Sequence, residues 1–287
     1  MNFGLYVPPM GEYASARVLA SLASDAEQAG WDGFFTWDHI ASGWSDRVTD
    51  PWIAYAAIAM VTSRIRFGPL VTPLPRRRPW KVARETVSLD QLSGGRLIFG
   101  VGTGGGPEEF ARLGEASDPK MLGAMLDEGL EVLLGLWSGE TFSHHGHFYQ
   151  VDEARFNPVP LQQPRIPVWV AGFWPNPAPF RRAARFDGVY PLNRDQEAFM
   201  TPEDYRQMLD LIARHRQVAG PFDVAHSGFS PGQDPDRAAE ITARYAQAGV
   251  TWWLENVNPW RFGWDMHGPW PVEAMRERIL QGPPRQG

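Results

Sequence analysis

Cysteine is absent from all 287 residues of the sequence. This absence excludes disulfide bonds, thiolate zinc sites, iron–sulfur clusters and cysteine nucleophiles, and it is typical of proteins from a reducing compartment. The sequence also lacks any apolar run near the roughly 20 residues of a membrane span. No basic segment precedes the apolar beginning of the chain, as an export signal requires. We therefore predict a cytoplasmic protein that has no membrane partner.

A surplus of basic residues is missing as well. Lys and Arg total 27 against 33 Asp and Glu, which gives a formal net charge of −6, and we expect no nucleic-acid partner. The length suits either two average domains or one (β/α)₈ barrel of about 250 residues. Because no low-complexity tract or linker divides the chain, we predict a single domain over residues 1–287.

Short β-branched and aromatic runs alternate with amphipathic stretches along the chain. Eight of these runs are candidate strands: Phe3–Val7, Gly33–Trp37, Ile65–Thr72, Leu97–Gly102, Pro167–Ala171, Gly188–Leu192, Asp223–Gly228 and Val250–Asn256. The strands have no polar face, which favours a parallel sheet covered by helices. Eight β-then-α units predict an α/β fold, a single (β/α)₈ TIM barrel with an insertion between the fourth and fifth strands.

The expected helix boundaries carry recognisable capping chemistry. At four helix starts a proline follows a capping side chain, namely at Asp50, Asp118, Thr201 and Asp234. At three helix ends a glycine leads into the next strand, and we predict the left-handed conformation at Gly30, Gly188 and Gly249.

The insertion follows from the connection between the fourth and fifth strands, which is about 65 residues long and exceeds ordinary connection lengths. One long helix, ending near Trp137, fills the first half. We predict that the remainder, about 138–165, is a small insertion in which Thr141–Pro158 forms a hairpin at the barrel rim. His144, His145 and His147 lie in it, but no carboxylate stands at ligand spacing, and we predict no metal site.

Active sites of such barrels lie at the C-terminal ends of the strands, so the residues that follow each strand are the candidates. They include Asp38 and His39, Arg76 to Arg78, Thr103 to Gly106, Gly172 to Trp174, Asn193, Trp260, Phe262 and Trp264. Glycines let backbone N–H groups approach a ligand, arginines bind phosphate, and aromatic rings stack on conjugated ligands. The combination predicts a large, flat, anionic ligand; a solvated arginine loop is the alternative.

The glycine-rich stretch formally matches a dinucleotide-binding pattern through Gly100, Gly102 and Gly105. That pattern belongs after the first strand of a βαβ unit, with an acidic residue about 20 positions further on. Here it follows the fourth strand and precedes the long helix, so we reject a Rossmann site. Tight packing of a barrel strand accounts for Gly100, but the five glycines between Gly100 and Gly106 exceed what a turn requires.

Asp38 and His39 are the strongest candidates for acid/base catalysis, because a histidine at a strand end exchanges protons near neutral pH. Adjacent strand residues point to opposite faces, so we expect only one of the two to face the pocket. In the alternative interpretation Asp38 caps a turn and His39 packs under the loop that contains Trp44. Glu255 lies at the end of the last strand, but it has no partner carboxylate, which argues against a glycosidase.

Several segments, taken in order, resemble the bacterial luciferase-like flavin-dependent oxidoreductases. They are Phe3-Gly4-Leu5-Tyr6, Glu27 to His39, Thr62 to Gly68, Leu89 to Gly104, and Pro164 to Gly172. The resemblance spans essentially the whole chain. It implies a TIM barrel that binds FMN or the deazaflavin coenzyme F420 and transfers hydride or, with oxygen, acts as a monooxygenase on a small, largely apolar organic substrate. It also implies a homodimer and, with FMN, a separate flavin reductase.

The resemblance implies a set of site residues too. A bulge in the third strand, where a non-prolyl cis bond is one expectation, supports the cofactor ring. The implied cofactor-binding residues are Pro69, Leu70, Thr72, Arg76, Arg77, Gly102, Thr103, Gly104, Ala171, Gly172 and Asn193. The implied catalytic residues are His39, as acid/base, and Asp38, which assists it. The implied substrate pocket is shaped by Trp44, Trp174, Trp260, Phe262 and Trp264.

The sequence departs from the family pattern in the loop after the fourth strand. Some deazaflavin enzymes carry a glutamate directly after the Thr-Gly pair, where this chain has Gly105, with Glu108 and Glu109 further along. FMN and F420 therefore both stay open as cofactors. Two other classes also stay open: a non-catalytic flavin-binding protein on the same barrel, and a cofactor-free or metal-dependent barrel hydrolase or lyase.

Overall fold

Strands and helices alternate along the chain in the computed structural model, which describes residues 1–105, 107–195 and 198–284. The strands of the main sheet are β1 (Asn2–Val7), β2 (Gly33–Thr36), β3 (Arg66–Pro69), β4 (Thr72–Pro73), β5 (Phe99–Gly102), β8 (Val168–Trp174), β9 (Gly188–Asn193), β10 (Asp223–Gly228) and β11 (Trp252–Asn256). The helices are α1 (Ala16–Gln28), α2 (Pro51–Val61), α3 (Pro79–Ser93), α4 (Pro107–Ala111), α5 (Pro119–Trp137), α6 (Pro177–Ala183), α7 (Pro202–Ala213), α8 (Pro235–Ala246) and α9 (Val272–Leu280). Short 3₁₀ helices span Gly11–Tyr13, Leu74–Arg76 and Pro259–Phe262.

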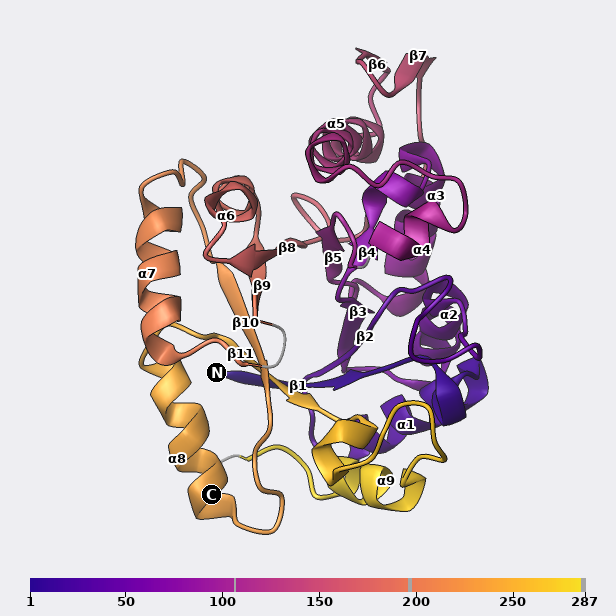
Figure 1. Ribbon diagram of the computed structural model, residues 1–287. Helices are drawn as coiled ribbons and strands as arrows, with labels where there is room; N and C mark the ends of the chain where they lie inside the picture. The colour runs from indigo at the N-terminus through magenta and orange to yellow at the C-terminus, as the bar shows by residue number, and fades with distance from the viewer. Residues whose placement is uncertain (106, 196–197, 285–287) are drawn as a thin grey trace.

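The strands form one parallel sheet in the order β3-β2-β1-β11-β10-β9-β8-β5-β4, and the helices surround it (Figure 1). β3 and β4 are two pieces of the third barrel strand. They are separated by Leu70 and Val71, whose peptide bond is cis, at the place where the bulge was expected. A bridge between Phe67 and Leu97 joins the third strand to the fourth. The TIM barrel predicted from the sequence is thereby confirmed.

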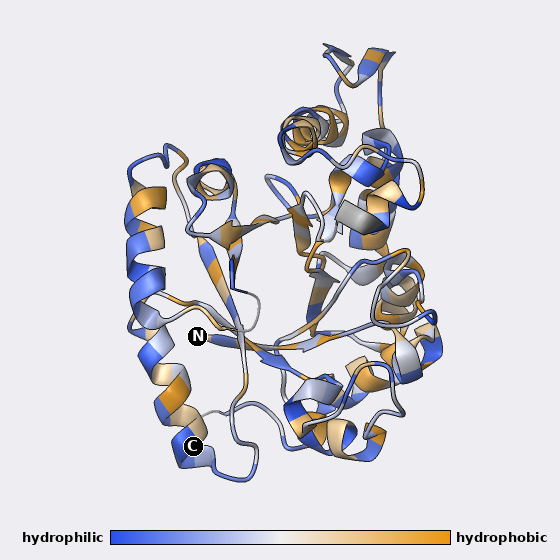
Figure 2. Ribbon diagram, viewed as in Figure 1, coloured by the Kyte–Doolittle hydropathy of each residue, from blue (hydrophilic) through white to orange (hydrophobic). Residues whose placement is uncertain are grey.

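Two apolar cores lie on either side of the barrel wall. The inner core consists of Phe35, Leu70, Ile98, Trp169, Tyr190, Ala225, Trp252 and Leu254. Its rings fill the barrel: Trp169 lies 5.5 Å from both Phe35 and Trp252, measured between ring centroids. Most of the outer core lies between the strands and the helices, and it extends to Trp37 at the end of β2. Figure 2 shows mainly hydrophobic residues in β3, β5 and β8, whereas α7 and α8 alternate between hydrophobic and hydrophilic residues, as half-buried helices do.

Local signals place most helix boundaries. The Asp50 carboxylate accepts hydrogen bonds from the Trp52 and Ile53 N–H groups, and Asp118, Thr201 and Asp234 cap their helices in the same way. Gly30 and Gly249 have positive φ as predicted. The prediction for Gly188 was wrong: it begins β9 in an extended conformation. Glycine is needed there because a Cβ would lie 2.5 Å from Trp169 Cδ1.

The insertion forms an antiparallel hairpin of β6 (Phe142–His145) and β7 (Gln150–Ala154), which stands apart from the ring of strands in Figure 1. Glu128 of α5 holds it by accepting hydrogen bonds from the Phe148 and Tyr149 N–H groups, and it pairs with His144 Nε2 at 3.2 Å. Within the residues that the structure describes, no helix has both the length and the apolar composition that crossing a membrane requires.

Candidate active site

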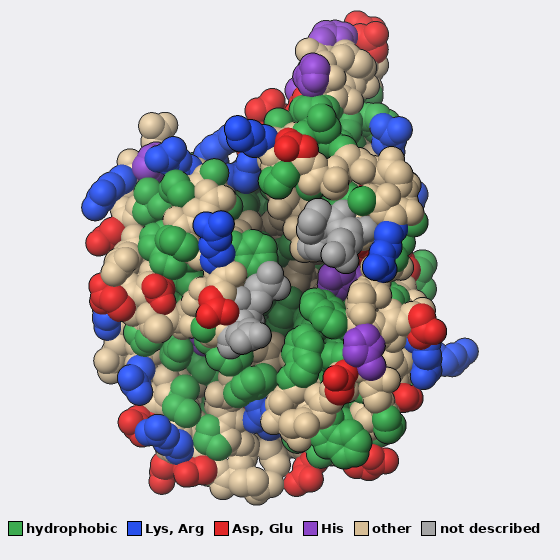
Figure 3. Space-filling view, in the orientation of Figure 1, with side chains coloured by type: hydrophobic (Ala, Val, Ile, Leu, Met, Phe, Trp, Pro, Cys, Tyr) green, Lys and Arg blue, Asp and Glu red, His purple; other side chains and the backbone are tan. Residues whose placement is uncertain are grey.

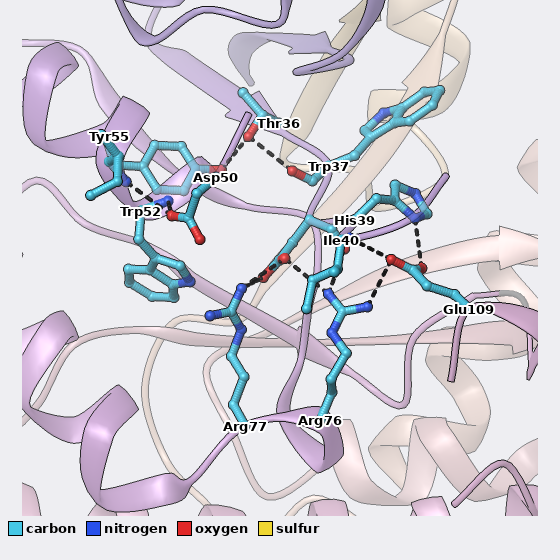
Figure 4. A network of polar contacts seen from close by, with 12 residues as sticks. Thr36, Trp37, His39, Ile40, Asp50, Trp52, Tyr55, Arg76, Arg77 and Glu109 are labelled. Atoms are coloured by element: carbon cyan, nitrogen blue, oxygen red, sulfur yellow. Dashed lines mark hydrogen bonds and ion pairs between the residues drawn. The ribbon is translucent and has the colours of Figure 1, made fainter. Parts of the chain in front are cut away.

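Residues at the end of β2 alternate between the two faces of the barrel wall. Trp37 lies on the inner side, 5.9 Å from Tyr6, which packs on the inner core. Asp38 points to the opposite side, where it contacts two arginines. His39 returns to the inner side, 6.0 Å from Trp37 (Figure 4). Only one member of the Asp38–His39 pair therefore faces the mouth of the barrel, and it is the histidine.

Asp38 is completely buried and is neutralised by Arg76 and Arg77. Arg76 Nη2 lies 3.1 Å from Asp38 Oδ1, and Arg77 Nη2 lies 2.9 Å from both carboxylate oxygens. The Arg76 side chain is 1% exposed. These are the arginines for which the sequence suggested a phosphate. In this structure the anion that they bind is a carboxylate of the protein, and a phosphate would compete with Asp38 for the same N–H groups. Their phosphate-binding role stays a prediction.

Glu109 of α4 connects the loop after β5 to the loop after β2. Its Oε2 lies 3.0 Å from His39 Nδ1, while its Oε1 accepts hydrogen bonds from the Ala41 N–H at 3.0 Å and from the Ile40 N–H. Arg76 Nη1 lies 2.9 Å from Oε1. Burial alone would raise the pKa of the Glu109 carboxyl, but these hydrogen bonds and the Arg76 charge outweigh it and lower the pKa to about 2. Glu109 is therefore a carboxylate at neutral pH.

The ionised Glu109 fixes the orientation of the His39 imidazole. A carboxylate can only accept hydrogen bonds, so His39 Nδ1 must carry the proton that it shares with Glu109. The other ring nitrogen, Nε2, is then the one that remains for chemistry in the pocket.

Sequence reasoning missed Glu109 as a partner of His39. Its location in the loop after the fourth strand, on the same rim as His39, was the only available signal. Of the other residues in that loop, Gly106 and the Glu108 side chain lie outside the part of the chain that is described.

Tryptophan rings surround His39 on the inner side. Trp44 lies 5.7 Å from His39 and 5.3 Å from Trp37, and Trp260 lies 5.7 Å from Trp44 and stacks on Trp37 at 6.2 Å. We call Trp37, Trp44 and Trp260 the tryptophan group. Figure 3 shows a hollow with hydrophobic side chains at the centre of this face. Two of the predicted pocket residues, Trp44 and Trp260, are thus brought together beside His39.

The other three predicted pocket residues lie elsewhere. Trp174 packs on Phe180 of α6 at 5.4 Å, Phe262 packs against the outer core, and Trp264 is half exposed. Their role in a substrate pocket stays a prediction. A separate cavity of about 540 Å³ adjoins Trp44 and is lined by polar residues that include Glu12, Arg47 and His267.

A surface of four partly buried side chains lies above the inner core, and of these four Ala171 alone was predicted to bind the cofactor. Tyr6, Val71, Ala171 and Leu192 are partly buried side chains that pack on it. Tyr6 also donates a hydrogen bond from its hydroxyl to the Leu70 carbonyl oxygen at 2.6 Å. This apolar floor fits one side of a planar ring system.

Glycines of the loop after β5 line one edge of this floor. A Cβ at Gly102 would lie 3.0 Å from Val71 Cγ2, so a side chain at this position would crowd the floor, whereas a Cβ at Gly105 would meet nothing within 4 Å. Gly104 has a φ of +91°. The loop from Gly102 through Thr103 to Gly105 therefore presents backbone groups rather than side chains, as close approach to a ring edge or a phosphate requires.

Three of the predicted cofactor residues have other contacts. Thr72 pairs in register with Val101, which belongs to the outer core, so it faces away from the floor. Gly172 is packed against α6, where a Cβ would lie 2.1 Å from Pro179 Cβ. Asn193 accepts a hydrogen bond from the Asp195 N–H at 3.0 Å. A direct contact of these residues with a cofactor stays a prediction.

Comparisons with known proteins agree on one family. The model of the luciferase-like monooxygenase family matches residues 1–274. The F420-dependent hydroxymycolic acid dehydrogenase of Mycobacterium tuberculosis is 34% identical over 189 residues, which are 64% of this chain and 51% of that protein. The oxygenase component of the flavin-dependent trigonelline monooxygenase of Acinetobacter baylyi is 31% identical over 158 residues, which are 55% and 43% of the two chains.

Solved structures agree on the fold. The coenzyme F420-dependent tetrahydromethanopterin reductase of Methanopyrus kandleri superposes with a TM-score of 0.76 at 18% identity, covering 98% of this chain and 96% of that one. The chain spans about half the length of the curated relatives it matches. The order of its motifs, the barrel with its interrupted third strand and the match over residues 1–274 lead to one conclusion: the chain belongs to the luciferase-like monooxygenase family.

Proposed function

We propose that the chain is an oxidoreductase that uses FMN or F420 on a small, largely apolar substrate, with His39 as the acid/base. The observation that carries the proposal is the His39–Glu109 pair, held at 3.0 Å beside the tryptophan group and next to the apolar floor. The curated relatives include one protein named for flavin and one named for F420, and the apolar floor with its glycine edge suits the planar ring that both cofactors carry. When bound, either cofactor supplies a hydride donor or acceptor, and FMN also supplies oxygen chemistry.

The residues of the chain have distinct tasks in this proposal. The apolar floor supports the cofactor ring, and the Gly102–Gly105 backbone contacts its edge. The tryptophan group excludes water and binds the apolar substrate. His39 Nε2 gives a proton to the reacting substrate atom or takes one from it, while Glu109 holds Nδ1 and orients the ring. Asp38 acts on this site only indirectly, because Arg76 contacts both Asp38 and Glu109.

The proposal is tested by titrating the purified protein with FMN and with F420 in parallel, following fluorescence and melting temperature. Tight binding of F420 alone would identify hydride transfer. Tight binding of FMN alone would direct the search to oxygen-dependent substrates and to a separate flavin reductase, a partner that the name "oxygenase component" of the Acinetobacter relative suggests. Binding of neither cofactor would contradict the proposal.

The barrel hydrolase alternative loses its candidate acid in this structure. Glu255 is completely buried, and it pairs with Arg261 and with Arg278 Nη2, the latter at 3.3 Å. Such a carboxylate cannot reach a substrate without breaking both ion pairs.

A homodimer is the second part of the proposal, and the outward face of α2 is the surface we assign to it. Ile53, Ala56, Ala57 and Met60 recur at helical spacing on this face, and Ile53 and Met60 are 65% and 70% exposed. Residues Pro51–Val61 include no charged side chain. A wholly uncharged helix with an exposed apolar stripe is typical of a surface that another copy of the chain covers. The single-domain organisation and the cytoplasmic location stay predictions.

A further inference from the structure

A cavity of about 340 Å³ lies at the N-terminal end of the barrel, opposite the rim that carries His39. Its volume falls within the range of small-molecule sites, which is about 300–1,000 Å³. Active sites of such barrels occupy the other end, so this cavity is separate from the proposed catalytic site. Four of its six lining residues are charged, two of each sign. The lining residues stand within two positions of the first residue of a strand: Asn2, Asp32, Arg64, Arg66, Asp223 and Trp252.

Arg66 and Asp223 stand on opposite sides of this cavity. Arg66 begins β3, which belongs to the third strand of the barrel, and Asp223 begins β10, which is the seventh. In a closed ring of eight strands the third and the seventh face each other across the barrel. The sheet order agrees, because β2, β1 and β11 separate β3 from β10. The cavity therefore carries a positive charge on one side and a negative charge on the other.

Neither charge is neutralised by an ion pair within the described part of the chain. Arg66 Nη2 donates a hydrogen bond to Gln162 Oε1 at 3.0 Å, which is a neutral acceptor. Asp223 Oδ1 accepts hydrogen bonds from the Thr251 hydroxyl at 3.1 Å and from Trp252 Nε1 at 3.2 Å, which are neutral donors. Burial lowers the pKa of Arg66 and raises the pKa of Asp223, and the charge of each offsets only part of this effect on the other. Each ion has lost part of its water without gaining a counter-ion in contact.

The other two charged residues of the cavity are held by the backbone. The Arg64 guanidinium donates hydrogen bonds to two backbone carbonyl oxygens, at 3.2 Å and 2.7 Å, so it adds positive charge at the β3 side. Asp32 Oδ2 accepts a hydrogen bond from a backbone N–H at 2.9 Å. Arg66 and Asp223 are therefore the ions of this cavity that gain most from a ligand of opposite charge.

We propose that this cavity binds a small amino acid in its zwitterionic form, with the carboxylate on Arg66 and the ammonium group on Asp223. A guanidinium can bind a carboxylate through two parallel N–H···O bonds, and an ammonium group donates to a carboxylate. A simple anion would leave Asp223 without a counter-ion, and a simple cation would leave Arg66 without one. A molecule that carries both charges neutralises both walls at once. The inference goes beyond the proposed function, because the cavity lies at the opposite end of the barrel from His39.

Calorimetric titration of the whole protein with three probes of one shape tests the inference. L-alanine carries both charges, isobutyrate has a methyl group in place of the ammonium group, and isopropylammonium has a methyl group in place of the carboxylate. Each analogue lacks one hydrogen-bonded contact to a charged group, so each should bind about tenfold more weakly than alanine. An analogue that binds as tightly as alanine would overturn the inference, and so would the absence of alanine binding at millimolar concentrations.

Two variants that each remove one charge of the cavity provide a second measurement. Asp223→Asn and Arg66→Gln should each weaken alanine binding about tenfold, whereas Asp223→Asn should leave isobutyrate binding unchanged. Asp236→Asn and Arg17→Gln make the same changes of charge at exposed positions and should bind alanine as the unmodified protein does. Full affinity for alanine in either cavity variant would overturn the inference.

If a cavity variant does not fold, the comparison of the three probes on the unmodified protein decides alone. Failure of the proposed function is a separate result, because it is read from the cofactor titration. Alanine binding that depends on both charges, in a protein that binds neither cofactor, would support the inference while contradicting that function.

Discussion

Glu109 contributes both to the chemistry of the site and to the stability of the fold. Its single carboxylate contacts His39, the Ile40 and Ala41 backbone and Arg76. The loop after β5 and the loop after β2 are therefore held together by one ionised group, and protonating that group weakens both the site and the fold.

The pH dependence of stability follows from the pKa of Glu109. Its folded-state pKa of about 2 lies below the unperturbed value of 4.5. The carboxylate therefore stabilises the fold above a pH of about 4.5, and this contribution, about 3 kcal/mol, is lost as the pH falls toward 2. We expect the free energy of unfolding of Glu109→Gln to be lower than that of the unmodified protein at pH 7, and we expect the difference to shrink to less than half of this value at pH 3. Urea unfolding between pH 3 and pH 7 measures this.

Glu115→Gln, an exposed neighbour in the same segment, is the control and should follow the unmodified protein throughout. A constant difference between Glu109→Gln and the unmodified protein at every pH would show that the contacts of Glu109 do not depend on its ionisation.

His39 is expected to act in turnover rather than in cofactor binding. Removing a positioned acid/base costs on the order of 100-fold or more in rate. We therefore expect His39→Ala to lower the rate of cofactor oxidation or reduction by about this factor, while the cofactor Kd changes little. Stopped-flow kinetics and fluorescence titration on the same preparation compare the two quantities. Comparable losses in both would remove His39 from its assigned role.

At the scale of elements, β11, the loop after β10 and α9 are joined by one buried carboxylate. Glu255 accepts hydrogen bonds from the Ser230 N–H at 2.9 Å, the Ser230 hydroxyl at 2.6 Å and Trp253 Nε1 at 2.8 Å, besides its two arginine partners. Deleting one member of a buried ion pair leaves an uncompensated charge, which costs about 3–5 kcal/mol.

Glu255→Ala should therefore lower the free energy of unfolding by about this amount, because Arg261 and Arg278 lose their partner. Urea denaturation at pH 7 measures it. Glu273→Ala, at an exposed position of α9, should change the free energy of unfolding little. A small effect at Glu255 would mean that the two arginines find water or other acceptors when the carboxylate is gone.

The elements were predictable from the sequence to the extent that their signals are local. Asp50 and Pro51 mark a helix start within two residues. The apolar runs of the strands are likewise recognised from consecutive residues, without knowledge of the strands that lie beside them in the fold. Gly188 was misjudged because its glycine is required by the distant Trp169 ring rather than by a turn. The contact between His39 and Glu109 joins residues 70 positions apart. The charges of Arg76 and Arg77 predicted an anionic ligand, but charge alone could not show that both side chains contact the Asp38 carboxylate, and their contact with a ligand stays a prediction.

For the whole molecule, the prediction concerns assembly through the outward face of α2. Met60→Glu places a charge in the middle of this apolar stripe, and burying it unpaired opposes association. We expect the unmodified protein to elute as a dimer and the variant as a monomer with an unchanged circular dichroism spectrum. Size-exclusion chromatography with light scattering reports the mass directly.

Met121→Glu, which adds the same charge at an exposed position of α5, serves as the control and should leave the dimer intact. A monomeric unmodified protein, or a Met60→Glu variant that still dimerises, would exclude α2 as the interface.

The tryptophan rings inside the barrel and at its mouth also have an optical consequence. Trp169 and Trp252 fill its interior, and the tryptophan group lies above them at the mouth. A flavin absorbs where tryptophan emits, so a flavin resting on the apolar floor would accept excitation from emitters both beneath and beside it. Dimming of the ultraviolet emission of the protein would therefore report bound flavin without any added label. The dimming that survives replacement of the three mouth rings would come from the other ten tryptophans, Trp169 and Trp252 among them.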